Sequence, residues 1–358
     1  SFQALIGATG IEGHALAPWS AVFLAVACFA CGLAAVHAYD GFGALRRSLL
    51  AILLIGGAMS VAQYLLAVNG LWNLAGFGSG LVGLIVGAVV VRLPFYRLEG
   101  ARATGSSHDD EGRRRPLPLL AVSPYVILVI LVAAAELVPV IHTALNSVLI
   151  RVYFPEVSTA YGWVTEAGTG RTISVFGHAG ALLGYTCLIA YFIYRRAGLY
   201  QPGTVRRIWQ RTLRSAVPSS IGIAFMVGMA MIMDHCGMTH LLAQGISQSV
   251  GAAFPFFSPL IGTLGAFMTG SNTNSNVIFA PLQQSTAALI GISVLVILGA
   301  QTTGGALGSM LAPAKVIVGS STAGLAGREG EVMKKTLPYG VLIASVVGLL
   351  AWFVIYAA

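Results

Sequence analysis

Gly270-Ser271-Asn272-Thr273-Asn274-Ser275-Asn276 decides the fold, because it places six hydrogen-bonding side chains in series between two apolar segments, residues 256–268 and 277–289. A polar tip of this kind cannot face lipid, since unsatisfied polar groups at membrane depth cost several kcal/mol each. Each apolar arm has about a dozen residues, well short of the roughly 20 that a spanning helix needs. The stretch therefore predicts a re-entrant hairpin whose tip is buried in protein or lines a wet cavity.

The composition of the 358-residue chain is typical of a polytopic membrane protein. Hydrophobic residues make up 56% and charged residues only 9%, with a mean hydropathy of +0.83, which leaves too little charge to cover a soluble fold. Besides an interrupted crossing after the hairpin, apolar windows of spanning length lie at residues 15–37, 48–68, 74–91, 119–141, 175–194, 216–233 and 337–356. The sequence predicts an all-α membrane protein with about eight spanning segments.

The positive residues behind the net charge of +8 are concentrated in a few loops, which indicates how the chain is oriented in the membrane. No nucleic-acid partner is expected. Of the 20 Lys and Arg residues, 17 fall in four loops, at Arg46-Arg47 and in residues 92–115, 195–214 and 328–335. The positive-inside rule places these loops in the cytoplasm. We therefore expect a multi-pass protein of the inner cell membrane, with the hairpin entering from the external face.

A polar segment divides the chain in two. Residues 99–118 combine Gly, Ser, His and both signs of charge, which is the composition of a flexible cytoplasmic loop. Before it we expect an N-terminal membrane segment with three spans, at residues 1–98. After it, residues 119–358 are expected to form a C-terminal membrane segment that holds the hairpin at about 256–289 and a broken helix at about 290–325.

The broken helix is expected from a second polar interruption, Gln301-Thr302-Thr303-Gly304-Gly305-Ala306-Leu307-Gly308-Ser309-Met310, which precedes Pro313. Its glycines and the proline predict that a spanning helix breaks there, and the new helix ends would offer N–H groups to an anion and carbonyls to a cation. With the hairpin tip, this is typical of secondary transporters. The alternative is glycine-mediated helix packing, which we prefer for Gly262, Gly265, Gly291 and Gly299.

Four ionisable residues in or near the expected spans are candidates for ion coupling. Glu136 lies inside a span, where an acid is a functional candidate by default, although a protonated carboxyl bonded to a neighbouring helix is the alternative. Asp234 and His235 lie near the external end of a span, where a solvated helix terminus is the alternative. Lys315 either attracts an anion or snorkels to the interface.

An enzyme is not expected. The chain has no His-Glu-x-x-His metal motif, no Gly-x-Ser-Gly with a matched histidine, and Tyr39-Asp40 lacks the companion Gly-x-Gly-Asp of an aspartyl protease. Cys28-x-x-Cys31 lies inside an apolar window without a partner pair or histidine at zinc spacing, so we interpret both cysteines as small packing residues. No metal and no cofactor is expected.

Four phrases carry a resemblance to a known family: Phe256-Phe257-Ser258-Pro259, Phe267-Met268-Thr269-Gly270-Ser271-Asn272-Thr273-Asn274-Ser275-Asn276, Thr302-Thr303-Gly304-Gly305 and Gly324-Leu325-Ala326-Gly327-Arg328-Glu329-Gly330. In this order and spacing the chain resembles the L-lactate permease family. The resemblance implies a secondary carrier for L-lactate, glycolate and other short 2-hydroxy monocarboxylates, driven by proton symport. It also implies an elevator-type transporter built from inverted repeats, with residues 119–358 as the C-terminal transport repeat.

Two departures from the family pattern leave alternatives open. Members of the family are longer, and the first inverted repeat is the missing part, so the resemblance implies a C-terminal portion that works with an N-terminal permease half or a second copy. Asn272 stands where some relatives carry an acid, which puts the coupling ion in question. The alternatives are a non-transporting or partner-dependent half of a split carboxylate carrier, and a carrier for another small carboxylate coupled to sodium.

The polar stretches suit a small hydroxycarboxylate. Such a substrate needs a few amide or hydroxyl donors for its carboxylate and one donor–acceptor pair for its hydroxyl. A half-helix N-terminus that points at the anion removes the need for a buried arginine. The expected substrate-binding residues are Ser271, Asn272, Thr273, Asn274, Asn276, Gln301, Thr302, Thr303 and Gly304.

Overall fold

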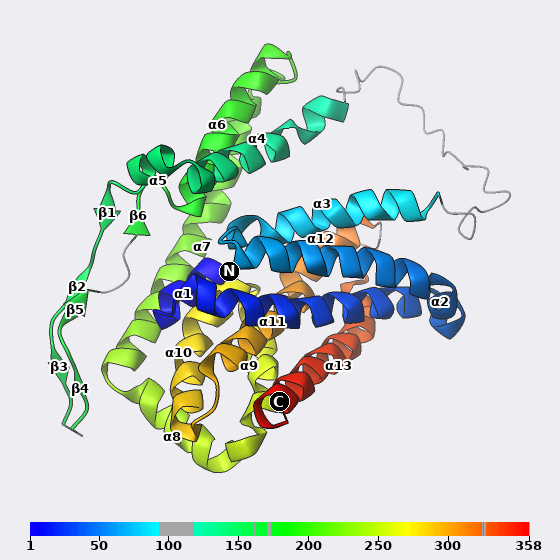
Figure 1. Ribbon diagram of the computed structural model, residues 1–358. Helices are drawn as coiled ribbons and strands as arrows, with labels where there is room; N and C mark the ends of the chain where they lie inside the picture. The colour runs from blue at the N-terminus through cyan, green and yellow to red at the C-terminus, as the bar shows by residue number, and fades with distance from the viewer. Residues whose placement is uncertain (93–117, 161, 170–172, 324, 326, 358) are drawn as a thin grey trace. The chain divides into compact units, whose positions relative to one another are not determined.

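The computed structural model describes residues 1–92, 118–160, 162–169, 173–323, 325 and 327–357. They are mostly helical (Figure 1) and divide into two compact units. The loop expected at residues 99–118 lies outside the described residues, except for Pro118. The first unit comprises Ser1–Val90, Pro155–Ala167 and Ile223–Ala358, and the second comprises Val91–Phe154 and Gly168–Gly222.

The second unit contains α4 (Pro118–Leu137), α5 (Pro139–Leu145), α6 (Ala179–Arg196) and the first part of α7 (Thr204–His235). Pro139 begins α5 after an extended Val138, and the two apolar helices α4 and α5 meet at 93°, because proline cannot continue the helix before it. The Tyr194 hydroxyl donates to the Leu120 carbonyl oxygen at 3.0 Å and ties α6 to α4.

Short antiparallel strand pairs follow α5. In the second unit, β1 (Leu149–Ile150) pairs with β6 (Ile173–Ser174), and β2 (Tyr153–Phe154) pairs with β5 (Gly168–Thr169). In the first unit, β3 (Val157–Ser158) pairs with β4 (Val164–Thr165). The all-α expectation was wrong for this stretch, because pairs of two residues are too short to leave an alternating pattern in the sequence.

The first unit holds the polar stretches. Its other elements are α1 (Phe2–Thr9), α2 (Gly13–Val68), α3 (Trp72–Val90), the end of α7, α8 (Met238–Val250), the 3₁₀ turn η2 (Gly251–Ala253), α9 (Phe254–Thr269), α10 (Asn272–Ile290), α11 (Val294–Leu311), α12 (Pro313–Thr322) and α13 (Glu329–Tyr356). Within this unit α9 packs along α11, and both contact α10 and α13.

The long helix α2 consists of two arms (Figure 1). Asp40 (φ −146°, ψ 28°) and Gly41 (φ 65°, ψ −154°) leave the helical conformation between them. Only glycine adopts the conformation of Gly41 readily. The windows expected at residues 15–37 and 48–68 therefore lie on separate helical arms.

We expect Gly41→Ala to lower the free energy of unfolding by roughly 1–3 kcal/mol, because an L side chain is strained in this backbone conformation. Thermal unfolding of the purified protein in detergent measures the effect. Gly43→Ala is the matched control, since an added Cβ meets nothing within 4 Å at either position and Gly43 has no positive φ. Equal unfolding temperatures for the two variants would contradict the strain at Gly41.

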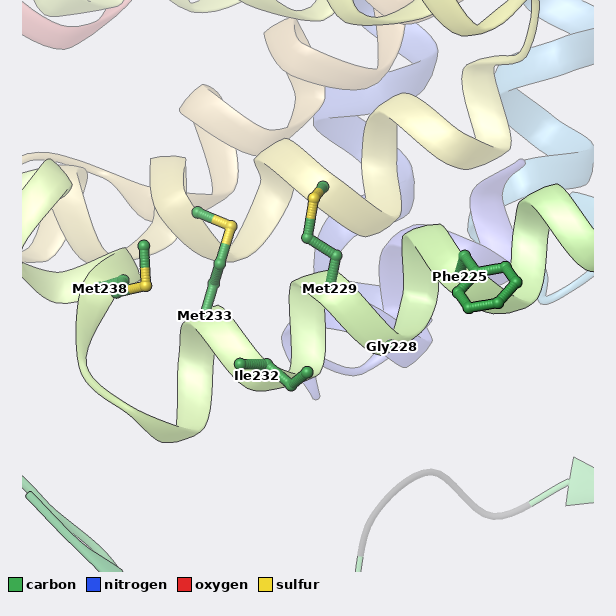
Figure 2. Close-up of a pocket in the computed structure, with 6 residues that line it drawn as sticks. All are labelled: Phe225, Gly228, Met229, Ile232, Met233 and Met238. Atoms are coloured by element: carbon green, nitrogen blue, oxygen red, sulfur yellow. The ribbon is translucent and has the colours of Figure 1, made fainter.

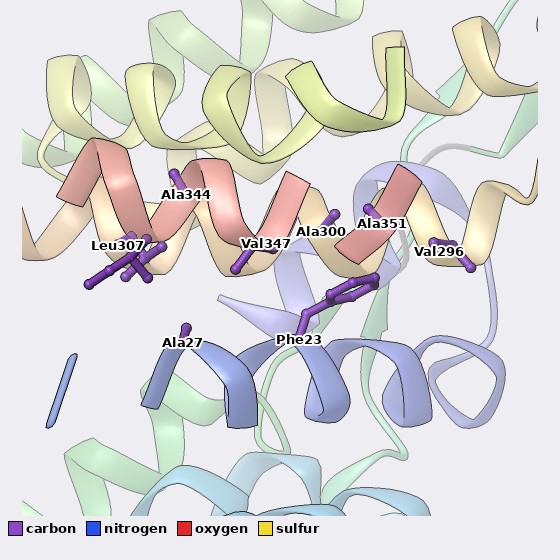
Figure 3. Packing of buried hydrophobic residues seen from close by; sticks show 9 residues of the cluster. Phe23, Ala27, Val296, Ala300, Leu307, Ala344, Val347 and Ala351 are labelled. Carbon is purple, nitrogen blue, oxygen red and sulfur yellow. The ribbon is translucent and has the colours of Figure 1, made fainter. Parts of the chain in front are cut away.

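The hydrophobic core of the first unit joins α2, α11 and α13 (Figure 3). Phe23 of α2 is fully buried and belongs to one cluster with Val296 of α11 and Val347 of α13. The remaining buried members are mostly small, namely Ala27, Ala300, Leu307, Ile343, Ala344 and Ala351. Small residues let helices approach closely, as is common in membranes, so α11 is held firmly against both partners.

Among the described residues, five helical segments are long and apolar enough to cross a membrane, or six if the bent pair α4–α5 counts as one span. About eight were expected. The difference arises because α2 counts once despite its two arms, because α4 counts only together with α5 as a bent pair, and because α6 and α7 are not among the five. The five are Gly13–Val68, Trp72–Val90, Met238–Thr269, Val294–Leu311 and Glu329–Tyr356.

The helix break lies later in the chain than expected. Residues 301–310 belong to the continuous helix α11, and the interruption is at Ala312 (φ −59°, ψ 138°), directly before Pro313. The glycines of α11 serve close packing instead. An added Cβ would lie 1.9 Å from the Pro259 carbonyl oxygen at Gly304, and 1.9 Å from the Thr263 carbonyl oxygen at Gly308. The packing alternative was therefore correct for these glycines, and the proline breaks the helix.

Glycine packing is confirmed at three of the four positions for which it was preferred. An added Cβ would lie 2.3 Å from the Gln301 carbonyl oxygen at Gly262, 2.5 Å from the Phe279 ring at Gly265, and 3.0 Å from the Trp19 backbone at Gly299. Gly291 instead ends α10 with φ 78°, the usual role of a glycine at a helix C-terminus.

Candidate functional site

Helices α9 and α10 form a helical hairpin around the polar run, while α9 also continues α8 in the candidate span Met238–Thr269. The re-entry of this hairpin into the membrane stays a prediction. Gly270 ends α9 with φ 71°, and Ser271 is extended, with its Oγ accepting the N–H of Asn274 at 3.3 Å. The polar run is thus mainly the capped first turn of α10. A helix N-terminus carries partial positive charge and free N–H groups, so the tip favours an anion.

Thr302 joins the tip to α11. The Asn272 amide Nδ2 donates to the Thr302 carbonyl oxygen at 3.2 Å, and the Asn276 Nδ2 donates to Thr302 Oγ1 at 2.9 Å. Asn276 is fully buried and Thr302 is 4% exposed. The Oδ1 atoms of Asn272 and Asn276 are buried and have no hydrogen-bond partner in the described part of the chain. Buried acceptors of this kind normally find a donor, which a ligand can supply.

Lys315 brings a positive charge to the same tip. It is exposed on α12, just beyond the break at Ala312. Its Nζ donates to Ser309 Oγ, which in turn donates to the Gly270 carbonyl oxygen at 3.4 Å. An ammonium group beside a helix N-terminus adds to the attraction for an anion.

The other predicted binding residues lie either in the first turn of α10 or inside α11. In the first turn of α10, Thr273 is exposed and Asn274 is buried. In α11, Thr303 Oγ1 donates to the Gly299 carbonyl oxygen of its own helix at 2.9 Å, Gly304 packs on Pro259, and Gln301 is fully buried. The structure therefore brings Thr302 to the hairpin tip, and substrate contact stays a prediction for all of these residues, Thr302 included.

Of the four coupling candidates, Lys315 lies at the tip. His235 ends α7; its Nδ1 lies 2.9 Å from the Met231 carbonyl oxygen, and its own carbonyl oxygen accepts the Thr165 hydroxyl at 2.9 Å. Glu136 and Asp234 occupy helical positions in α4 and α7, but their side chains lie outside the described residues. A role in coupling stays a prediction for all four.

A buried polar network beneath the tip was not predicted from the sequence. Ser258, Ser275, Gln283 and Gln301 are 0% exposed. Gln283 Nε2 donates to the Ser258 carbonyl oxygen at 3.1 Å and to Gln301 Oε1, and Gln301 Nε2 donates to Ser275 Oγ at 3.2 Å. The available signal was the pair Gln283-Gln284 inside the second apolar arm of the hairpin, because a polar residue there is costly without a partner.

A separate groove of about 530 Å³ lies at the end of α7 and the start of α8. The close-up in Figure 2 shows only carbon and sulfur on the side chains that it draws. The lining residues are Phe225, Gly228, Met229, Ile232, Met233 and Met238. Such walls offer no strong hydrogen-bonding group to a small anion. The groove therefore suits an apolar neighbour, and the candidate site is the hairpin tip.

The fold and the site define a polytopic helical membrane protein with a polar hairpin tip held inside it, which is the organisation of a secondary carrier. The family model for L-lactate permease matches residues 2–358. The chain belongs to the L-lactate permease family, a family of transporters rather than enzymes.

Curated relatives match parts of the chain. The glycolate permease GlcA of Escherichia coli K12 is 36% identical over 143 residues, 40% of this chain and 25% of that protein. The L-lactate permease of the same strain is 35% identical over 139 residues, 39% of this chain and 25% of that protein. The L-lactate permease of Bacillus subtilis 168 is 30% identical over 171 residues, which are 48% of this chain and 30% of that protein. The chain thus matches about a quarter of its relatives' length, and no solved structure matches it.

Proposed function

We propose that the chain carries the substrate site of a proton-coupled symporter for L-lactate, glycolate and related short 2-hydroxy monocarboxylates in the inner cell membrane. Family membership supports this proposal, as do relatives named as L-lactate and glycolate permeases. The observation that carries it is the hairpin tip. It has a capped helix N-terminus and two amide oxygens without a hydrogen-bond partner among the described residues, and Ser309 links the Lys315 ammonium to Gly270.

In this proposal the two ends of the substrate meet different groups. The carboxylate accepts hydrogen bonds at the N-terminus of α10, from backbone N–H groups and the hydroxyls of Ser271 and Thr273, and Lys315 supplies the opposite charge. The 2-hydroxyl group donates to Oδ1 of Asn272 or Asn276. An anion without a hydroxyl leaves these acceptors unpaired, so the site favours hydroxy acids.

The proposed transport cycle uses the hairpin as a moving element. Helices α9 and α10 would enter the membrane from the external face and return, within an elevator-type transport repeat at residues 119–358. The break before α12 supports this arrangement, since it places a helix end and Lys315 next to the tip.

The test is ligand binding by the purified chain in detergent, measured by calorimetry. We expect L-lactate and glycolate to bind, and propionate, which lacks the hydroxyl, to bind about two- to tenfold more weakly, because one hydrogen bond contributes a net ~0.5–1.5 kcal/mol. Equal affinity for L-lactate and propionate would contradict the proposed role of the amide oxygens. If none of the three compounds binds, the hairpin tip is not the substrate site.

Uptake of labelled L-lactate into proteoliposomes tests the coupling ion. We expect an imposed inward proton gradient to drive accumulation when an N-terminal permease half is reconstituted together with the chain. If L-lactate accumulation depends on a sodium gradient and does not change with the proton gradient, the result favours the sodium-coupled alternative.

A further inference from the structure

Gln283 is the central residue of the buried network. It lies in the middle of α10, fully buried, and its amide is bonded on both sides. Its Nε2 donates to the Ser258 carbonyl oxygen at 3.1 Å and to Gln301 Oε1, while its Oε1 accepts the Ser258 hydroxyl. Ser258 Oγ also lies 3.0 Å from the Ile297 carbonyl oxygen. One side chain therefore links α9, α10 and α11.

Gln301 connects this centre to the hairpin tip. Its Nε2 donates to Ser275, at 3.2 Å from Oγ and 3.4 Å from the carbonyl oxygen. Ser275 Oγ donates across the hairpin to the Gly262 carbonyl oxygen at 2.9 Å. Ser275 precedes Asn276, and Gln301 precedes Thr302, so the network ends one residue away from both partners of the bond at the tip.

Amide side chains make the hydrogen bonds between α10 and α11. Helices α9 and α11 touch through glycine backbone at Gly262, Gly304 and Gly308, whereas α10 is bonded to α11 through Asn272 and Asn276 at the tip and through Gln283 beneath it. A buried polar pair is satisfied in only one register, which is the best-attested use of such pairs in helical assemblies. The amides of Gln283 and Gln301 thus discriminate between neighbouring alignments of α10 and α11.

We propose, building on the proposed function, that Gln283 is a positioning residue that acts through Gln301 to set the register of the hairpin tip against α11. Without it, Gln301 Oε1 and the Ser258 carbonyl oxygen lose the Gln283 donor, while Ser258 Oγ keeps the Ile297 carbonyl oxygen. Helix α10 is then free to shift relative to Thr302. Asn276 then no longer meets the Thr302 hydroxyl. Substrate affinity falls because the binding groups are misplaced, although none of them has been changed.

The experiment compares Gln283→Leu with two other variants by L-lactate binding to the purified chain. Gln283→Leu keeps the approximate volume and is expected to raise Kd about tenfold. Gln283→Glu is expected to restore affinity at pH 5.5 to within about threefold of the parent, because a carboxyl buried among amides is protonated there and keeps a donor and an acceptor. Gln284→Leu is the matched control; Gln284 lies on the same helix but donates to Thr9 of α1 at 3.3 Å, and its loss is expected to change Kd less than twofold.

A second measurement needs no substrate. The four cysteines are replaced by serine, and Ser271→Cys is then added as a reporter of how tightly the hairpin tip is held. In this background Gln283→Leu is expected to speed labelling of the new cysteine by a soluble thiol reagent at least threefold. Gln284→Leu is expected to leave the labelling rate unchanged. A parent that binds no L-lactate while this difference persists would contradict the proposed function and support the positioning role. Parent-like binding and labelling in Gln283→Leu would overturn the positioning role, as would Gln283→Glu binding as weakly as Gln283→Leu at pH 5.5.

Discussion

Replacing Gly304 with alanine is expected to abolish the packing of α9 on α11. The new Cβ would lie 1.9 Å from the Pro259 carbonyl oxygen and 2.6 Å from its carbonyl carbon. Backbone atoms cannot rotate aside as the end of a flexible side chain can, so the helices must separate. The loss in free energy of unfolding exceeds the roughly 1–3 kcal/mol of ordinary overpacking, because separating α9 from α11 also breaks the buried hydrogen bonds of Gln283 and Gln301. We expect little or no folded protein, measured as monodisperse yield and unfolding temperature in detergent.

Two further variants complete this test. Gly308→Ala should behave alike, since its Cβ would lie 1.9 Å from the Thr263 carbonyl oxygen. Gly245→Ala is the control: Gly245 is exposed on α8 with nothing within 4 Å of an added Cβ, so alanine is expected to be neutral or to stabilise by up to about 1 kcal/mol. An unchanged unfolding temperature in Gly304→Ala would mean that α9 and α11 are further apart than the structure places them.

The helical hairpin was predictable from the sequence because its determinants are local. Gly270 can take a positive φ, Ser271 can cap the helix that follows, and apolar residues flank both. The break in the next helix was predicted at the wrong place for a physical reason. Glycine lowers helix propensity in isolation, but at Gly304 and Gly308 contact with α9 outweighs that cost, so the helix continues to Leu311.

The arrangement of the site was only partly predictable. The polar side chains of both stretches could be identified, and Thr302 does meet the tip. Contacts between distant residues could not be foreseen, because no periodicity connects Lys315 and Ser309 to the Gly270 carbonyl oxygen, or Gln283 to Ser258. These pairings follow from how α9, α10 and α11 pack, which depends on backbone contacts at glycines rather than on side-chain pattern.

Replacing Asn272 with alanine is expected to weaken L-lactate binding about five- to 150-fold, the equivalent of ~1–3 kcal/mol. The variant removes an unpaired acceptor at the tip and also the 3.2 Å bond that holds the Thr302 carbonyl oxygen. Ser271→Ala and Thr273→Ala are expected to fall in the same range, because each removes a donor for the carboxylate. Calorimetry on the purified variants measures these changes.

A control and a double variant separate contact with substrate from general damage. Asn69→Ala removes an exposed asparagine whose Nδ2 donates to the Leu65 carbonyl oxygen of its own helix at 2.7 Å, and it is expected to leave Kd unchanged. Asn272 and Asn276 both bond Thr302, so the double variant Asn272→Ala with Asn276→Ala is expected to lose less affinity than the sum of the two single losses. Parent-like affinity in Asn272→Ala and Ser271→Ala would place the substrate away from the hairpin tip. Additive losses would mean that the two asparagines act independently, which is incompatible with a shared anchor at Thr302.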